Sequence, residues 1–309
     1  MTEDRTTQKI LAVVGPTSTG KSAFAVRFAK EQGGEIINAD SRQVYRHMNI
    51  GTAKSPVIDR AAVPHHLIDV ADPDEQYGLG VYLRHARQAI EDILSRSRLP
   101  IVVGGSGQYV WALLEGWQIP EVKPDLELRA QLEAKMNSEG VRTLHEQLTL
   151  LNPDAARDID SSNPRRVIRA IEIWRSAKHS SENPRRKPPP FGQVVLGLTL
   201  HRATLYSRID SRVDTMIEQG FVDEVRALLE RGYGLDMPSM SSIGYSEIGA
   251  HLKGRGTLDE STEEMKRRTR KLVRQQYNWF RPEDDRINWF QGTAAGFDEA
   301  SNWASDELA

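Results

Sequence analysis

Short apolar runs alternate with helical patterns over the first third of the chain. Nearly continuous runs of aliphatic residues predict buried strands at 9–14, 35–39, 66–70 and 100–103. Apolar residues spaced three and four positions apart predict helices after Ser22 and over 80–95. Alternating strands and helices form right-handed βαβ units around a parallel sheet, which binds its ligands at the carboxyl ends of the strands. We therefore expect functional residues directly after these runs.

The pattern changes between residues 121 and 190, where no clear strand occurs. Amphipathic, charged helices are predicted there at 125–137, 140–151 and 164–177. A strand at 194–200 follows, and then helices at 202–219, 221–231 and 260–280. The simplest organisation is an α/β fold with a parallel sheet flanked by helices. It is formed by residues 1–120 and 191–309, with an all-helical insertion domain at 121–190.

Composition restricts the class of protein. The chain has 309 residues, 39% of them hydrophobic and 27% charged, which is typical of a folded globular protein. Its net charge of −2 excludes a uniformly basic nucleic-acid binder, but not a basic face balanced by acid elsewhere. The lack of cysteine excludes disulfides, zinc–thiolate sites and thiol nucleophiles. No apolar run is long enough to span a membrane and the polar N-terminus lacks a signal-peptide layout, so we expect a cytosolic enzyme.

Residues 15–22, GPTSTGKS, match the phosphate-binding motif G-x-x-x-x-G-K-[ST] at every fixed position. Glycines let the backbone wrap around an anion, and the following helix presents its positive end. Lys21 adds a full charge, and the Ser22 hydroxyl is placed to ligate Mg²⁺. The alternative is a glycine turn without a ligand, but the strand before it and the helix after it favour a P-loop-type sheet. The motif does not show which di- or triphosphate is bound.

A typical nucleoside triphosphatase holds magnesium with an Asp at the end of a second apolar strand. Here the best such strand, 100–103, is followed by Gly-Gly-Ser instead. Asp69 and Asp40 are the alternative carboxylates. The position of Asp40 at the tips of the predicted strands favours a functional role over that of a helix N-cap.

Two basic clusters indicate a nucleic-acid partner. Residues 265–281, MKRRTRKLVRQQYNWFR, contain seven Lys or Arg and no acid, interspersed with aromatic side chains. A second cluster has three arginines within residues 165–169, on a predicted helix of the insertion. Such stretches are typical of RNA binding, in which phosphates supply affinity and bases stack on rings. The alternative is that Trp279 and Phe280 belong to the core and the charges form a solvated face, but two clusters favour an RNA clamp.

With these features together, the sequence resembles the bacterial-type tRNA dimethylallyltransferases (tRNA isopentenyltransferases) over about residues 12–289. The matching motifs are GPTSTGKS (15–22), NADSRQVY (38–45), NIGTAK (49–54), PHHLIDVADP (64–73), VVGGSGQY (102–109), NPRRVIRAIE (163–172), GFVDEVRAL (220–228), IGYSE (243–247) and NWFR (278–281). The family combines a P-loop-type α/β core with a helical insertion, in agreement with the organisation predicted above. Ser106 stands where the family usually carries Thr, and Gln275 where it commonly carries Arg.

The resemblance implies transfer of a prenyl group rather than a phosphoryl group. The dimethylallyl group of dimethylallyl diphosphate would pass to N6 of the adenosine at tRNA position 37, next to the anticodon, and pyrophosphate would leave. Asp40 would take the N6 proton, Ser106 would orient the acceptor, and Mg²⁺ held by Ser22 would neutralise the leaving group. For Arg226, an implied diphosphate ligand, the alternative is an exposed helix charge. The implied diphosphate ligands are Gly15, Pro16, Thr17, Ser18, Thr19, Gly20, Lys21, Ser22 and Arg226.

The resemblance also implies contacts with the tRNA anticodon stem-loop, whose target base must leave its stack to reach the site. The implied contact residues are Asp40, Ser41, Arg42, Gln43, Ser106, Arg129, Arg165, Arg166, Arg169, Ser241, Ser242, Ile243, Gly244, Tyr245, Ser246, Arg270, Arg274, Gln275, Gln276, Trp279 and Arg281. We expect a monomer that does not associate with membranes.

Three other functions are compatible with parts of the pattern. A nucleotide or small-molecule kinase would share the P-loop-type core, but it leaves the basic stretch 265–281 unexplained. A nucleotide-regulated RNA-binding protein would keep the basic helices but would not need Asp40. A prenyltransferase acting on free AMP or ADP would not need an RNA clamp. The tRNA prenyltransferase is the hypothesis that uses all of these features.

Overall fold

The computed structural model describes residues 8–119, 125–176 and 186–309 of the chain. The chain divides into two compact units, Met1–Gly116 with Pro188–Ala309 and Trp117–Lys187. We call these the sheet unit and the helical unit. None of the helices in the described residues is long and apolar enough to cross a lipid bilayer.

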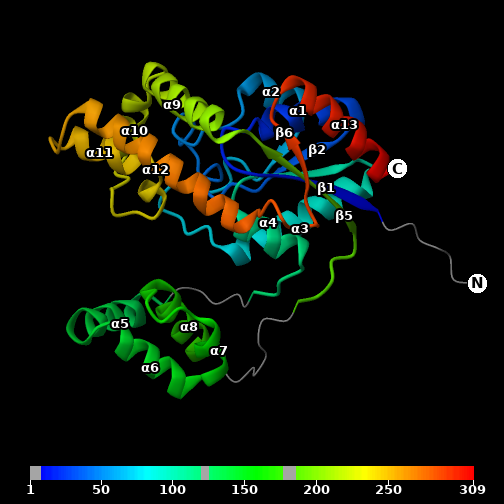
Figure 1. The fold of residues 1–309 in the computed structure, drawn as a ribbon. Coiled ribbons are helices and arrows are strands. Elements are labelled where there is room, and N and C mark those ends of the chain that lie inside the picture. Colours follow the sequence, from blue (N-terminus) through cyan, green and yellow to red (C-terminus); the bar gives the residue numbers. More distant parts are fainter. Residues whose placement is uncertain (1–7, 120–124, 177–185) are drawn as a thin grey trace, which may run out of the picture. The chain divides into compact units, whose positions relative to one another are not determined.

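The sheet unit is built on six strands in the order β3-β2-β4-β1-β5-β6, and every neighbouring pair is parallel (Figure 1). Val13 pairs with Val103, and Val103 pairs with Asn38, so β1, β2 and β4 end at one edge. The predicted α/β fold with a parallel sheet is therefore confirmed. The strands are β1 (Lys9–Val14), β2 (Glu35–Asn38), β3 (His65–His66), β4 (Pro100–Val103), β5 (Gly192–Thr199) and β6 (Asn288–Gln291).

Strand β3 is shorter than the predicted run 66–70. Leu67 and Asp69 have φ values of 63° and 57°, which are left-handed and end an extended strand. The Asp69 carboxylate is held by Lys54 at 2.6 Å and by Arg60 at 2.9 Å. The strand prediction for 67–70 is therefore wrong, and Asp69 belongs to an ion-pair network rather than to a metal site.

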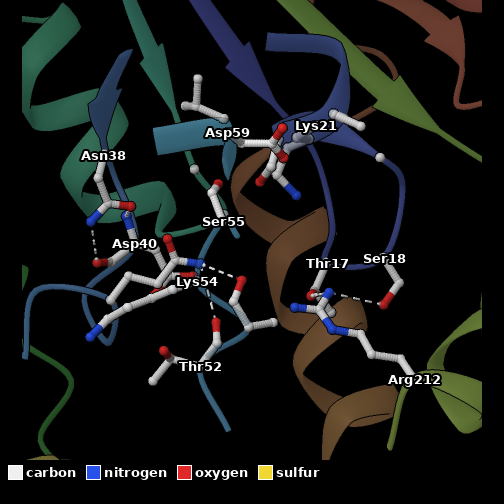
Figure 2. Close-up of a pocket in the computed structure, with 18 of the residues that line it drawn as sticks. Thr17, Ser18, Lys21, Asn38, Asp40, Thr52, Lys54, Ser55, Asp59 and Arg212 are labelled. Carbon is white, nitrogen blue, oxygen red and sulfur yellow. Dashed lines mark hydrogen bonds between the residues drawn. The ribbon is translucent and has the colours of Figure 1, made fainter. Parts of the chain in front are cut away.

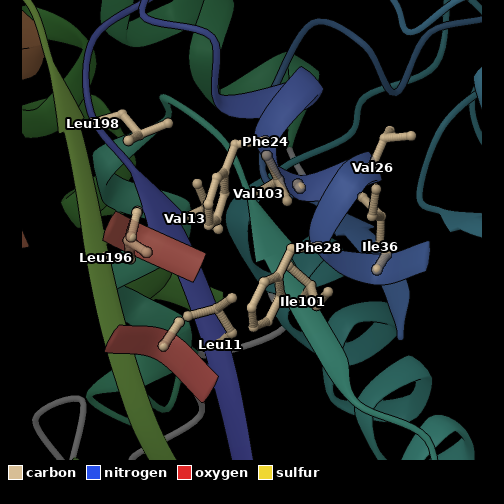
Figure 3. Close-up of a cluster of buried hydrophobic side chains, with 14 of the residues drawn as sticks. Leu11, Val13, Phe24, Val26, Phe28, Ile36, Ile101, Val103, Leu196 and Leu198 are labelled. Carbon is tan, nitrogen blue, oxygen red and sulfur yellow. The ribbon is translucent and has the colours of Figure 1, made fainter. Parts of the chain in front are cut away.

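Helices cover both faces of the sheet (Figure 1). On one face lie α1 (Lys21–Gln32) and α13 (Ala294–Leu308), and Phe24 and Phe28 of α1 pack there against strand residues such as Leu11 and Ile101 (Figure 3). On the other face, α3 (Leu79–Ser95) packs against β2 and β4, and α4 (Gly107–Leu114) packs beside it. This core holds the carboxyl ends of the strands in fixed positions.

A second hydrophobic cluster lies beyond those strand ends. It joins residues 44–48 to the helices that follow β5, with Phe221 and Tyr245 in an edge-to-face contact at 5.0 Å between ring centroids. The longest of these helices is preceded by its N-cap Thr257, whose Oγ1 accepts from the Glu260 N–H, and ends at Trp279. The helices of this region are α9 (Arg202–Glu218), α10 (Phe221–Glu230), α11 (Tyr245–Leu252) and α12 (Leu258–Trp279), whereas α2 (Val57–Ala62) lies between β2 and β3 in the chain and has no buried residue.

The helical unit has a hydrophobic core of its own. Leu128, Leu144, Leu148 and Ile171 are among the buried side chains that its helices share. A short helix that the pattern did not predict begins at Pro153, where the Asn152 side chain accepts from the Ala155 N–H. The helices are α5 (Leu126–Glu139), α6 (Val141–Leu151), α7 (Pro153–Asp158) and α8 (Pro164–Ser176).

Candidate active site

A cavity of about 500 Å³ opens at the carboxyl ends of β1, β2 and β4 (Figure 2). Its lining comes from the β1–α1 loop, the end of β2, residues 52–59, the β4–α4 turn, α9 and α12. We call residues 15–22 the phosphate end of the site. We call residues 38–43 together with Ser106 the carboxylate end.

The phosphate end is a backbone loop between β1 and α1. Gly15 has a φ of 125°, and a Cβ there would lie 2.3 Å from the Leu198 carbonyl oxygen, so only glycine fits. Gly20 precedes α1, where no described side chain forms a cap and the first turn holds no acid. The first N–H groups of α1 are therefore available to an anion, which the positive end of the helix also attracts.

Lys21 lies inside this loop. Its side chain is buried, and its Nζ donates to the Pro16 carbonyl oxygen at 2.6 Å. Burial, followed by the charge of Arg212, lowers the pKa of Lys21 to about 7, against the opposing effect of Asp40. A bound anion would supply the opposite charge that favours the ammonium form.

Arg212 of α9 reaches the same loop, although we did not predict this from the sequence. Its Nη1 lies 3.3 Å from Thr17 Oγ1 and 3.5 Å from Ser18 Oγ. Burial lowers the pKa of Arg212, and the charge of Asp40 opposes that effect. The available signal was an arginine on the inward face of a predicted helix, among the buried residues Leu205, Ile209, Val213 and Met216.

Arg226, which the resemblance assigns to the diphosphate, lies elsewhere. It belongs to α10, its side chain is 48% exposed, and its guanidinium pairs with Asp223 one turn earlier. It does not line the cavity. This arrangement is that of an exposed helix charge, the alternative stated above, because the face of α10 that carries Arg226 points to solvent.

Asp40 forms the carboxylate end, directly after β2. Its Oδ1 accepts from the Arg42 N–H at 2.8 Å, and the Asn38 side chain bonds both the Asp40 N–H and C=O at 3.1 Å. Residues 41–44 form turns, so Asp40 is not a helix N-cap. Asp40 lines the cavity with Lys21 and Arg212, and its charge acts on the pKa of both cations.

Ser106 connects the β4–α4 turn to this end of the site. Its Oγ accepts from the Ser41 N–H at 3.0 Å and donates to Ser41 Oγ at 3.3 Å. Its own N–H donates to the Ala39 carbonyl oxygen at 3.2 Å. Ser106 thus holds both neighbours of Asp40 in place, but it does not itself line the cavity.

The residues of helix α12 that the resemblance assigns to RNA contact are partly buried and partly exposed. Arg270 is half-buried and pairs with Asp210 of α9. Gln276 is only 7% exposed and contacts the phosphate end instead of solvent. Trp279 is 38% exposed whereas Phe280 is fully buried, so the two aromatic residues divide between surface and core. The implied contact residues that lie exposed here are Arg274, Gln275, Trp279 and Arg281.

The segment 241–246 is mostly inside the sheet unit. Tyr245 is fully buried, and its hydroxyl donates at 2.7 Å to Glu224, a carboxylate that also accepts from the Ile50 N–H at 2.8 Å. Ser242 is buried as well. The side chains of Tyr245 and Ser242 therefore cannot contact an RNA, contrary to the implication of the resemblance, whereas Ser241 is exposed.

The four arginines of the helical unit that the resemblance assigns to RNA contact also divide between ion pairs and the surface. Arg129 and Arg169 both pair with Glu172, whose side chain is fully buried, so they serve to neutralise a buried charge. Arg165 and Arg166 lie exposed in the first turn of α8. Of these four implied contact residues, only Arg165 and Arg166 lie exposed on the surface of the unit.

The cavity offers oxygen ligands for a metal ion. No group of three or more His, Asp or Glu side chains among the described residues is arranged to hold a metal. The Ser22 hydroxyl and the carboxylates of Asp40 and Asp59 do line the cavity. Because Mg²⁺ binds through one or two protein oxygens together with phosphates and waters, this donor set fits it.

Comparisons with known proteins place the chain in a family. A family model described as IPP transferase matches residues 43–283, and one described as isopentenyl transferase matches residues 8–59. The tRNA dimethylallyltransferase of Roseiflexus sp. (strain RS-1) is 49% identical over 273 residues, which cover 88% of this chain and 90% of that protein. That of Thermomicrobium roseum is 45% identical, covering 94% of this chain and 88% of that protein.

Solved structures agree with these sequence relatives. The full-length tRNA isopentenylpyrophosphate transferase of Bacillus halodurans is 39% identical, with a TM-score of 0.72 over 97% of each chain. A eukaryotic dimethylallyltransferase, described as acting on tRNA, is 28% identical, with a TM-score of 0.79 over 96% of this chain and 77% of that one. The protein therefore belongs to the tRNA dimethylallyltransferase (IPP transferase) family.

Proposed function

We propose that this protein moves the five-carbon group of dimethylallyl diphosphate to N6 of the adenosine at tRNA position 37 and releases pyrophosphate. The observation that carries the proposal is one cavity lined by two cations, Lys21 and Arg212, and by the carboxylate of Asp40. A diphosphate leaving group needs the cations, and an attacking amine needs the carboxylate. The names of the relatives support the same reaction.

The phosphate end is suited to a leaving diphosphate. Free N–H groups at the start of α1 and the side chains of Lys21 and Arg212 would bind its oxygens. Negative charge grows on the bridging oxygen as the allylic C–O bond breaks, and fixed positive groups stabilise that change. No phosphoryl group moves, so a strand-end Asp of the kind found in nucleoside triphosphatases is not required.

The donor set of the cavity fits Mg²⁺, as described above, and Ser22 with Asp59 would hold the ion. When bound, Mg²⁺ supplies Lewis-acid neutralisation of the diphosphate charge. The contribution of the chain is to hold the Ser22 hydroxyl in the first turn of α1, next to Lys21.

The carboxylate end is suited to the acceptor amine. The N6 nitrogen forms a bond to C1 of the dimethylallyl group, the C–O bond breaks, and pyrophosphate leaves with the electron pair. The N6 proton passes to Asp40, whose Oδ1 is fixed by the Arg42 N–H while Oδ2 accepts the amine. Ser106 orients this end through its two hydrogen bonds to Ser41.

The acceptor would be the anticodon stem-loop of a tRNA, with its target base extruded into the cavity. Exposed Arg274 and Arg281 would contact phosphates and exposed Trp279 would stack on a base. Arg165 and Arg166, which lie exposed, would give the helical unit phosphate contacts of its own. Because tRNA is the acceptor, we place the protein in the cytoplasm, and we expect it to act as a monomer.

Incubation with labelled dimethylallyl diphosphate, Mg²⁺ and tRNA from cells that lack the modification tests this function. We expect label in the tRNA, no label in a tRNA with guanosine at position 37, and no comparable hydrolysis of ATP. Labelling of free AMP at a similar rate would show that the acceptor is a free nucleotide instead of tRNA. Cleavage of ATP without prenyl transfer would indicate a kinase.

A further inference from the structure

The Gln276 side chain occupies an unexpected place. Although it belongs to the segment that resembles an RNA-binding one, it is only 7% exposed. Its Oε1 accepts from the Thr17 N–H at 2.9 Å, and its Nε2 donates to the Gly105 carbonyl oxygen at 3.1 Å. We infer that Gln276 is a positioning residue, which holds the diphosphate-binding loop and the β4–α4 turn in one arrangement for the reaction proposed above.

The two contacts place Gln276 at the junction of both ends of the site. Thr17 is held from a second side by Arg212, which lies 3.3 Å from its Oγ1. A Cβ on residue 105 would lie 2.3 Å from Gln276 Nε2, so the amide fills the space that this glycine leaves open. The next residue, Ser106, bonds Ser41 beside Asp40. One chain of contacts thus runs from the loop through Gln276 and the turn to the catalytic carboxylate.

Gln276 and the exposed residues of α12 face in different directions. Residues two positions apart on an α-helix differ by about 200°, so Gln276 points inward where Arg274 points outward. Gln275, the adjacent residue of the same type, is exposed. Helix α12 therefore supplies a matched pair of glutamines: Gln276 contacts the loop, and Gln275 faces solvent.

Substitution of each glutamine by methionine separates positioning from RNA contact. In Gln276→Met, both the Thr17 N–H and the Gly105 carbonyl lose their partner, and we expect the dissociation constants of inorganic pyrophosphate and dimethylallyl diphosphate to rise by about 5- to 100-fold. The affinity for an anticodon stem-loop RNA should stay within about twofold. Gln275→Met should leave both diphosphate affinities unchanged. Isothermal titration with each ligand alone measures all of these.

The opposite pattern overturns the inference. If Gln276→Met weakens RNA binding but leaves diphosphate affinity unchanged, Gln276 is an RNA contact. If neither the RNA affinity nor the diphosphate affinity changes, Gln276 has no positioning role. If both affinities fall, Gln276→Glu decides. Its protonated carboxyl has the same donor and acceptor as the amide, so diphosphate affinity relative to the wild type should recover as pH falls, and no recovery would disprove the role. Failure of the wild-type protein to bind pyrophosphate would instead contradict the proposed function.

Discussion

The two ends of the cavity are built in different ways. The phosphate end is one contiguous segment, residues 15–22, in which burial, followed by the charge of Arg212, lowers the pKa of Lys21 to about 7. The carboxylate end is assembled from three separate segments, because Asn38, Leu67 and Ser106 all contribute to the arrangement of residues 38–41. The phosphate end acts through positive charge, which a bound anion would neutralise. The carboxylate end acts through a geometry that hydrogen bonds hold in place. Substitutions at the first should therefore affect donor binding, and those at the second should affect turnover.

Asp40 gives the sharpest test of this division, with the largest expected effect. Asp40→Ala should lower turnover by about 10²–10⁴-fold, because the N6 proton loses its acceptor. The affinity for dimethylallyl diphosphate should be equal or higher, since a negative charge leaves the cavity, and tRNA affinity should persist. Single-turnover rates and separate binding titrations measure these quantities. An unchanged rate would remove Asp40 from its assigned role.

Arg212 tests the phosphate end, and Arg226 is its matched control. Arg212→Ala should weaken dimethylallyl diphosphate binding by roughly 10- to 100-fold, the usual range for loss of a hydrogen bond from a charged group. Arg226→Ala should change it by less than about twofold, because Arg226 pairs with Asp223 away from the cavity. The reverse result would restore the role that the family resemblance assigns to Arg226.

Local sequence predicted the loop of the phosphate end, but not the distant side chains that contact it. The loop 15–22 lies between a strand and a helix with strong patterns of their own, so its position in the fold followed. Arg212 and Gln276 are 195 and 259 residues away from Thr17, and only the packing of α9 and α12 brings them there. The prediction of a strand at 66–70 was wrong at 67–70, because Lys54 and Arg60, which pair with Asp69, lie outside that run.

The end of the chain shows a second limit of pattern analysis. The residues of helix α13 that are buried, such as Ala300, Ser301 and Ala304, are small, and its large apolar residues Phe297, Trp303 and Leu308 are only partly buried against the same cluster. The amphipathic pattern of this helix is therefore weak. Strand β6 has four residues and is not fully buried at any of them. Both were missing from the prediction for that reason, whereas the apolar runs of β1 and β4 were sufficient to predict those strands.

The pKa of Lys21 makes donor binding at the phosphate end depend on pH. In the free protein Lys21 loses its proton above about pH 7, and a bound diphosphate raises its pKa and restores the ammonium form. Affinity should be at its maximum below pH 7 and should fall by up to about tenfold per pH unit above it, with proton uptake on binding. Titrations between pH 7 and 9 in two buffers of different ionisation enthalpy measure both. In Lys21→Met this pH dependence should vanish, and its persistence would assign the titration to another group.

The smallest expected effect is on RNA binding. Loss of an RNA contact should weaken the affinity for tRNA without changing the affinity of the phosphate end for diphosphate. Arg274→Ala or Arg165→Ala should lower the slope of log K for tRNA against log salt by about 0.7–0.9, the value for one phosphate contact. Arg267→Ala is the control, because Arg267 pairs with Glu264 on the exposed surface of α12 and its loss should leave the slope unchanged. Diphosphate affinity should be the same in all three variants. An unaltered slope for Arg274→Ala would show that this arginine does not contact the RNA. A weaker diphosphate affinity in that variant would show that the surface of α12 and the loop are coupled, and would contradict the division of the site into two independent ends.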